Sequence, residues 1–338
     1  MNDISSYINF KDNTKLSELS KNDLFHLLLL LQDYLIEYRD TLDIDKDITF
    51  GLEIEFEHAD YEKIEELVNN LNLKRFPWTR TKWQTTQEIS ISDGGETKSP
   101  VLRDNINTWK QLKEITSVIK NYASIDNNAG GHIHIGKKIL NDDIDSWKNF
   151  LKLWIAYENI IFRFGYGEYL NARPIINNFA MPISNKLTKD ISYRYKSYRV
   201  LTRAINYNNK HYALNLDHLK FNCIYGSMPL NTIEFRNFNG TLNPIIWQNN
   251  VNFITKLLSY CNSYDFDSDI VDERRYQNKN KFKNPIYKYH QINIKQAIEL
   301  VDLIFDNNLD KINFLKQYFK NYQTSREYRA SKKLTKKI

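Results

Sequence analysis

The stretch Thr232–Asn243, T-I-E-F-R-N-F-N-G-T-L-N, decides the fold that we expect for the rest of the chain. Its polar and apolar residues alternate, which predicts a β-strand with Glu234, Arg236 and Phe238 on one face. The carboxylate and the guanidinium would then lie about 6–7 Å apart along the strand. Such a pair could hold a cation beside a phosphate or a carboxylate. Charges two residues apart are also common on exposed strands, so this stretch alone leaves both interpretations open.

The composition is that of an ordinary globular protein. The chain has 338 residues, of which 41% are hydrophobic and 14% aromatic, enough for one large domain or two average ones. Its two cysteines, Cys223 and Cys261, are too few for a disulfide framework or a cysteine-based zinc site. The longest apolar run, Leu27–Leu31, is too short to span a membrane, and the first residues lack a signal-peptide pattern. We therefore expect a cytoplasmic protein.

Most of the net charge of +6 lies near the C-terminus. Residues 323–338 contain six Lys or Arg residues and one Glu, so the residues before them carry a net charge of only +1. The basic tail could contact phosphates or anionic surfaces, but a disordered, solvated terminus is the favoured interpretation. Because the rest of the chain is nearly neutral, we expect neither specific nucleic-acid binding nor membrane binding.

A second predicted strand is rich in carboxylates. Ile48–Glu57, I-T-F-G-L-E-I-E-F-E, places Glu53, Glu55 and Glu57 on one face. Neighbouring carboxylates repel one another, and Glu is poorly represented in strands. This face is therefore either an acidic outer surface or one wall of a cation site.

A third predicted strand carries two histidines. In Gly130–Gly136, G-G-H-I-H-I-G, His132 and His134 would project from the same face, which is a spacing that suits metal ligands. A histidine in a protein core is usually satisfied by ordinary hydrogen bonds. Two histidines that alternate with isoleucines between glycines favour a functional site instead.

Two more carboxylates, Glu88 and Glu96, lie in the irregular to strand-like segment Trp83–Leu102. Carboxylate oxygens with at most one or two imidazoles favour Mg²⁺ or Mn²⁺ over Zn²⁺. Several carboxylates around such ions commonly hold a nucleoside triphosphate. Because the sequence has neither a P-loop nor a kinase glycine loop, ATP would have to bind through metal ions and strand side chains.

Helical periodicity predicts the elements that surround these strands. Helices are expected over residues 20–38, 61–71, 106–122, 147–161, 245–261, 293–306 and 311–322. Residues 212–221 are predicted to form another strand, and residues 271–290 a polar surface loop.

Four further residues are candidates to bind a substrate. Glu158 lies on the apolar face of a predicted helix, where a local hydrogen-bonding partner is the alternative explanation. Arg173 and Arg203 could bind an anionic substrate, although each could equally be a surface charge. Asn215 lies on the strand face opposite Leu214.

Five motifs together resemble those of one known family, the amidoligases, which are carboxylate–amine ligases similar to glutamate–cysteine ligase and glutamine synthetase. They occur in the family's order and spacing and span about Gly51–Trp247. The motifs are G-L-E-I-E-F (51–56), G-G-E-T-K-S-P-V-L (94–102), G-G-H-I-H-I (130–135), Y-A-L-N-L (212–216) and T-I-E-F-R-N-F-N-G-T-L (232–242).

The resemblance implies an α+β fold in which a curved, mostly antiparallel sheet forms a funnel-shaped site with helices packed outside, as in glutamine synthetase. It also implies ATP and two or three Mg²⁺ ions, with Mn²⁺ as a substitute, and ligation through an acyl-phosphate. The implied metal ligands are Glu53, Glu55, Glu88, Glu96, Glu234 and one of the two histidines, His132 before His134.

The same resemblance implies the catalytic and nucleotide-binding residues. Arg236 would hold the γ-phosphate and the phosphorylated carboxylate, Glu55 would act with it in catalysis, and Glu53 and Glu234 would bind ATP through the metal ions. The chain departs from the family where Gln87–Ser90 replaces an Asp-Gly-Ser-like element, which puts the role of Glu88 in question.

The motifs also divide the chain. Residues 48–262 would form the catalytic core, residues 1–47 a helical extension, residues 263–322 a C-terminal helical part, and residues 323–338 the basic tail.

The carboxylate and amine substrates could be small molecules, peptides or proteins, and an oligomer is compatible with the sequence. Two other functions stay open: a zinc metallohydrolase that uses His132 and His134, and a non-catalytic module that binds a nucleotide or peptide.

Overall fold

The chain forms an α+β structure around one open antiparallel sheet. The computed structural model describes residues 13–74, 82–88, 91, 93–125, 128–185, 187, 195–205, 211–219, 231–279, 289 and 291–320. The strands are β1 Phe50–Phe56, β2 Gln84–Gln87, β3 Gly95–Lys98, β4 Gly130–Gly136, β5 Leu214–Asn215 and β6 Thr232–Asn239. Their order in the sheet is β2-β3-β1-β4-β6-β5, and each neighbouring pair is antiparallel.

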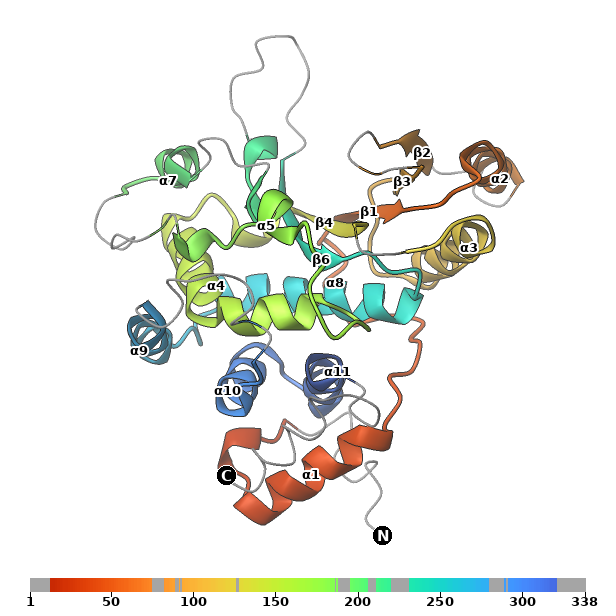
Figure 1. The fold of residues 1–338 in the computed structure, drawn as a ribbon. Helices are drawn as coiled ribbons and strands as arrows, with labels where there is room; N and C mark the ends of the chain where they lie inside the picture. The colour runs from red at the N-terminus through yellow and green to blue at the C-terminus, as the bar shows by residue number, and fades with distance from the viewer. Residues whose placement is uncertain are drawn as a thin grey trace.

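Several helices cover one face of this sheet in successive layers (Figure 1). The described helices are α1 Lys21–Asp33, α2 Tyr61–Lys74, α3 Ile106–Tyr122, α4 Ile144–Gly165, α5 Ile176–Phe179, α7 Tyr198–Ile205, α8 Pro244–Cys261, α9 Ser268–Lys279, α10 Ile294–Ile304 and α11 Asn308–Phe319. Helices α4 and α8 lie side by side under the sheet, α10 and α11 pack below them, and α1 packs on α11. Helices α2 and α3 lie at the β1–β3 end of the sheet.

The face of the sheet toward α4 is the hydrophobic core. Leu52 and Ile54 of β1 and Ile133 of β4 are buried there. Phe235 of β6 packs against Trp154 of α4, with ring centroids 5.4 Å apart. The alternation predicted for these three strands is therefore confirmed, and it leaves the acidic and imidazole side chains on the opposite face.

The alternation fails at one place, Phe238. The register between β4 and β6 shifts between Gly131 and Ile133, so β6 contains one extra residue before Phe238. Phe238 pairs with Gly131, whose missing side chain would point at Trp247 of α8. The prediction that Phe238 shares a face with Glu234 is therefore wrong, because the β-bulge turns it into the core.

Two predicted elements are shorter in the structure. The strand expected over residues 212–221 is reduced to Leu214–Asn215, because the Asn215 side chain accepts a hydrogen bond from the Asp217 amide and starts a turn. The 3-10 helix η6, Asp217–Leu219, follows, and residues 220–221 lie outside the described part. The first helix ends at Asp33, since Tyr34 has extended backbone angles.

The region predicted to be a polar surface loop, residues 271–290, begins with a helix instead. Helix α9 extends to Lys279, with Asp267 accepting a hydrogen bond from the Ile270 amide at its start. It packs on α4, where Lys152 forms an ion pair with Asp272 at 2.8 Å. Residues 280–288 and 290, and the basic tail, lie outside the described residues.

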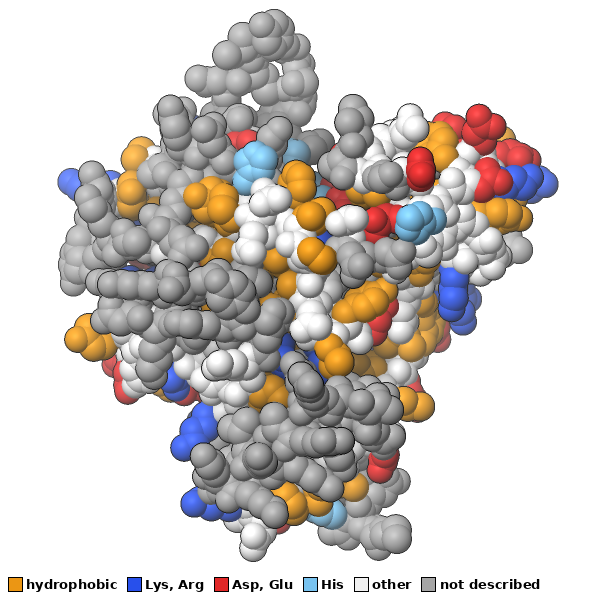
Figure 2. Space-filling model, viewed as in Figure 1, with side chains coloured by type: hydrophobic (Ala, Val, Ile, Leu, Met, Phe, Trp, Pro, Cys, Tyr) orange, Lys and Arg blue, Asp and Glu red, His pale blue; other side chains and the backbone are white. Residues whose placement is uncertain are grey.

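Basic side chains are scattered over the visible surface. In Figure 2 the Lys and Arg side chains among the coloured residues lie in small separate groups at the edges of the molecule. The described part of this face therefore carries no broad basic surface.

Candidate active site

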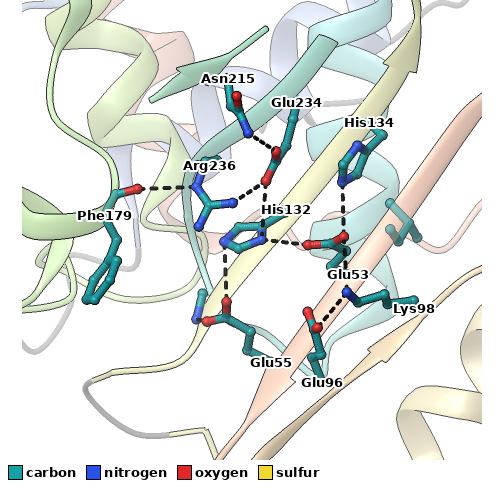
Figure 3. Close-up of polar contacts among 12 residues, drawn as sticks. Glu53, Glu55, Glu96, Lys98, His132, His134, Phe179, Asn215, Glu234 and Arg236 are labelled. Atoms are coloured by element: carbon teal, nitrogen blue, oxygen red, sulfur yellow. Dashed lines mark hydrogen bonds and ion pairs between the residues drawn. The ribbon is translucent and has the colours of Figure 1, made fainter. Parts of the chain in front are cut away.

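The polar face of the sheet forms one wall of a pocket of about 430 Å³. The lining residues come from strands β1, β3, β4, β5 and β6, from the residue directly after β2, and from three positions outside the strands. They are Glu53, Glu55, Glu88, Glu96, Lys98, His132, Phe179, His211, Asn215, His218, Glu234 and Arg236. Figure 3 shows ten of the central residues and the polar contacts between them.

Strand register explains why these side chains meet. Across the sheet, Lys98 of β3 pairs with Glu53 of β1, and Glu53 pairs with His132 of β4. Directly paired residues project from the same face about 5 Å apart, so each register pair becomes a contact pair. A second row is formed by Glu234 of β6, which pairs with both His134 and Asn215.

Glu53 lies at the centre of the first row, between two imidazoles. His132 Nδ1 is 2.9 Å from Glu53 Oε2, and His134 Nε2 is 3.2 Å from Glu53 Oε1. Burial raises the pKa of Glu53, but the contacts with His132 and His134 outweigh it and hold the pKa well below its usual range. Burial lowers the pKa of His134, and the contact with Glu53 reverses that and raises it. Glu53 is thus an ionised carboxylate in a confined space.

Glu55 is fixed by the backbone and by a buried arginine. It accepts a hydrogen bond from the Gly130 amide, and Arg173 Nη1 lies 3.3 Å from Glu55 Oε2. A side chain at Gly130 would place its Cβ only 1.8 Å from Arg173 Nη1, so glycine is needed for the guanidinium to reach Glu55. Burial lowers the pKa of Arg173, and the nearby Glu55 partly offsets this.

Glu234 is almost fully buried and has three polar partners. Arg236 forms an ion pair with Oε1, Asn215 Nδ2 donates to Oε2 at 2.6 Å, and His218 Nε2 lies 3.1 Å from Oε2. Burial raises the pKa of Glu234, but His218 and Arg236 outweigh it and hold the pKa well below its usual range. Arg236 is itself placed by its Nε, which donates to the Phe179 carbonyl at 3.3 Å.

Glu96 differs from the other carboxylates because a lysine neutralises it. Lys98 Nζ is 2.6 Å from Glu96 Oε1 and 3.9 Å from Glu53 Oε1. Burial raises the pKa of Glu96, and Lys98 offsets part of that rise. Burial lowers the pKa of Lys98, but the hydrogen bond to Glu96 reverses this and raises it. Glu88 follows β2 and lines the same pocket.

The donor set fits divalent cations. Among the described residues, two groups bring three potential ligand atoms within 4.8 Å of one another: Glu53, His132 and Glu234, and His134, His218 and Glu234. His132 Nε2 is buried and makes no hydrogen bond within the described part of the chain, although Glu55 Oε1 is 3.3 Å away. A buried nitrogen lone pair or N–H without a partner is costly, and a metal ion bound by this atom would remove that cost.

This geometry agrees with the comparison to protein families. The family model described as "Putative amidoligase enzyme" matches residues 79–258, which is more than half of the chain. The chain belongs to the amidoligase family. The resemblance found in the motifs is therefore confirmed, and the family is one of ligases that form amide bonds. None of the curated proteins matches the chain.

The matched segment of this amidoligase contains β2 to β6 and most of α8. Strand β1, with Glu53 and Glu55, precedes it but pairs with β3 and β4 inside it. Among the described helices, none has both the length and the hydrophobicity that a membrane span requires.

The four candidate substrate residues lie in different places. Asn215 lines the pocket and donates to Glu234. Arg173 is buried behind Glu55 and contacts the Arg236 carbonyl at 3.1 Å. Glu158 lies in the core on α4, away from the pocket-lining residues. The side chain of Arg203 lies outside the described part of the amidoligase.

Sequence reasoning missed three charged or titratable residues of the pocket, Lys98, His211 and His218. Lys98 had a signal, since it stands two residues after Glu96 in a strand and so shares its face. His218 and His211 had none, because they follow or precede the short β5 and depend on how its connections turn.

Proposed function

We propose that this amidoligase is an ATP- and Mg²⁺-dependent ligase that joins a carboxylate to an amine through an acyl-phosphate. The observation that carries the proposal is the single pocket in which Glu53, Glu55, Glu96, His132 and Glu234 lie together with Arg236. Carboxylates from several strands in one pocket suit two or more Mg²⁺ ions better than they suit one zinc ion. The proposal includes a glutamine-synthetase-like, funnel-shaped site, with Mn²⁺ able to replace Mg²⁺.

The metal ions would neutralise charge on the ATP phosphates and on the carboxylate that attacks them. Glu53, Glu234 and His132 would hold one ion, in agreement with their spacing. Glu55, Glu96 and Glu88 would complete the metal-binding wall. Lys98, next to Glu96, adds a fixed positive charge on the same side of the pocket.

Arg236 would stabilise the transferring phosphoryl group. Its guanidinium faces the pocket and is anchored by Glu234 and by the Phe179 carbonyl, so it is held in one position before the reactants bind. Asn215 would act through Glu234, because its amide donates to that carboxylate and limits its rotation.

The proposed reaction has two balanced steps. A substrate carboxylate oxygen forms a bond to the γ-phosphorus and ADP leaves with the electron pair of the broken P–O bond. The amine nitrogen then forms a bond to the acyl carbon, phosphate leaves, and the nitrogen loses a proton. The acidic pocket wall, including Glu55, is available to accept that proton.

The alternative of a hydrolase that binds zinc through His132 and His134 is less well supported. Among the described residues, the two imidazoles fall into different groups of potential ligands, and only Glu234 is common to both. A single zinc ion held by both histidines would need a different arrangement of the two side chains.

The test uses isotope transfer. The purified protein is incubated with Mg²⁺, ATP and pools of amino acids and peptides whose carboxylates carry ¹⁸O. We expect ADP, a condensed product, and one ¹⁸O atom in the released phosphate, because the acyl-phosphate passes one carboxylate oxygen to phosphorus. Release of AMP and pyrophosphate, or unlabelled phosphate with a condensed product, would overturn the acyl-phosphate route. Intact ATP in every pool, with no stabilisation by Mg²⁺ and ATP, would overturn the ligase itself.

A further inference from the structure

We propose that His134, His218 and Glu234 form a second cation site that selects a transition-metal ion such as Zn²⁺ or Co²⁺ rather than Mg²⁺. The ligand atoms of the three residues lie within 4.8 Å of one another. This proposal depends on the proposed function in one respect only: the second site shares Glu234 with the group Glu53, His132 and Glu234 that is expected to bind Mg²⁺.

His218 is the residue that distinguishes this site. It lies in η6, and its Nε2 is 3.1 Å from Glu234 Oε2. Its ring faces that of His134, with centroids 5.2 Å apart and planes inclined by 58°. The His218 side chain is 30% exposed, so an ion can reach the group from the pocket.

His134 provides the second, independent observation. Its Nε2 is buried and has no hydrogen bond to any described residue, although Glu53 Oε1 lies 3.2 Å away. Its Nδ1 lies 3.4 Å from Thr232 Oγ1, which orients the ring and leaves Nε2 facing the Glu53 carboxylate. A buried imidazole nitrogen that lies beside a carboxylate without a hydrogen bond is available to bind a cation.

Glu234 can serve both groups because its two oxygens face different ways. Oε1 contacts Arg236 and lies 3.7 Å from His132 Nδ1, whereas Oε2 faces His218. Asn215 also donates to Oε2, which still leaves a second lone pair on that oxygen. The carboxylate would therefore bridge two neighbouring cations.

The two groups differ in the ions that they favour. Glu53, His132 and Glu234 offer two carboxylates and one imidazole, which suits Mg²⁺ or Mn²⁺. The second group offers two imidazoles and one carboxylate, and imidazole ligands favour Zn²⁺ and Co²⁺ over Mg²⁺.

The test titrates the metal-free full chain with Co²⁺ in excess Mg²⁺ and follows the visible absorption of Co²⁺, then displaces it with Zn²⁺. We expect one Co²⁺ per chain. His218→Ala should weaken Co²⁺ binding by about 100-fold or more, because it removes a direct ligand. His211→Ala is the matched control, since His211 lines the same pocket but belongs to neither group and should leave the absorption unchanged.

Each outcome decides the question, provided that circular dichroism shows folded variants. No Co²⁺ binding by the unchanged chain in excess Mg²⁺, or equal binding by His218→Ala, would overturn the second site. Because ATP is absent from the titration, these results do not depend on ligase activity. An active ligase without Co²⁺ binding would refute the second site alone, and Co²⁺ binding without ligation would refute only the proposed function.

Discussion

Two carboxylates of this protein are equally buried and have opposite surroundings. Glu158 and Glu234 are each 2% exposed. Glu158 accepts hydrogen bonds from Trp154 Nε1 at 3.1 Å and from the Ile183 and Ser184 amides at 2.7 and 3.2 Å. All three donors are neutral, and Trp154 and Ile183 belong to the protein core.

Glu234 instead contacts a guanidinium and an imidazole that line a pocket. The pKa values follow this difference: burial raises the pKa of Glu158, with its donors offsetting only part of the rise, whereas the charged partners hold the pKa of Glu234 low. Burial alone therefore does not distinguish the two carboxylates. Contact with cationic groups at a pocket wall distinguishes Glu234 from Glu158.

The largest effect is expected at Glu234. Glu234→Gln should lower both ligation and Mn²⁺ affinity by roughly 100-fold or more, since even the partners of metal ligands cost about 10- to 100-fold when removed. The melting temperature should change little, because Gln keeps the shape and can still bond Arg236. Mn²⁺ binding followed by electron paramagnetic resonance checks this, and unchanged binding would place Glu234 in the same class as Glu158.

Glu158 should give the reverse result. Glu158→Ala leaves the buried donors of Trp154, Ile183 and Ser184 without an acceptor, so we expect a loss of about 3 kcal/mol in the free energy of unfolding. Urea denaturation measures the loss, and Glu158→Gln, which keeps one acceptor oxygen, should lose less. A stable Glu158→Ala variant without ligase activity would contradict the structural role.

A substitution at Gly130 tests whether the Arg173 guanidinium is held rigidly against Glu55. In Gly130→Ala the new methyl group overlaps the Arg173 guanidinium, which should cost about 1–3 kcal/mol and weaken its contact with Glu55. Gly51→Ala is the matched control on the adjacent strand, because its Cβ would meet no heavy atom nearer than 3.7 Å. Equal thermal stability of the two variants would mean that Arg173 moves freely.

The smallest effect is expected at Lys98. Lys98→Met removes a positive charge beside Glu96 and Glu53, so Mg²⁺ should bind more tightly, by at most about five-fold, because a half-exposed ion pair contributes less than about 1 kcal/mol. Calorimetric titration measures the change. Lys63→Met, which breaks an exposed pair with Glu66 on α2, should leave Mg²⁺ affinity unaltered. Weaker Mg²⁺ binding by Lys98→Met would show that the lysine assists metal binding.

The strands that carry the site could be predicted from the sequence because alternating polar and apolar residues reveal the two faces of a strand. Glu53, His132 and Glu234 each alternate with buried apolar residues, and the structure brings all three to one pocket. Lys98 could have been found by the same rule. The metal and nucleotide roles of these residues remain predictions.

Other features depend on contacts that alternation does not encode. The position of His218 follows from the pairing of Asn215 with Glu234 and from the turn that Asn215 begins. Helix α9 was missed because its sequence is polar. It packs on α4, where Lys152 pairs with Asp272, and its Val271 is buried.

The β-bulge in β6 has a consequence for comparing related chains. Phe235 and Phe238 both face the core, so the two residues between them, Arg236 and Asn237, lie opposite a single residue of β4. Of these two, only Arg236 lines the pocket. Deleting Arg236 would restore a regular strand and bring Asn237 next to Glu234, whereas deleting Asn237 would restore the strand and keep the arginine there. An alignment that slides by one position at this point would therefore compare an arginine with an asparagine, and only the first of them lines the pocket.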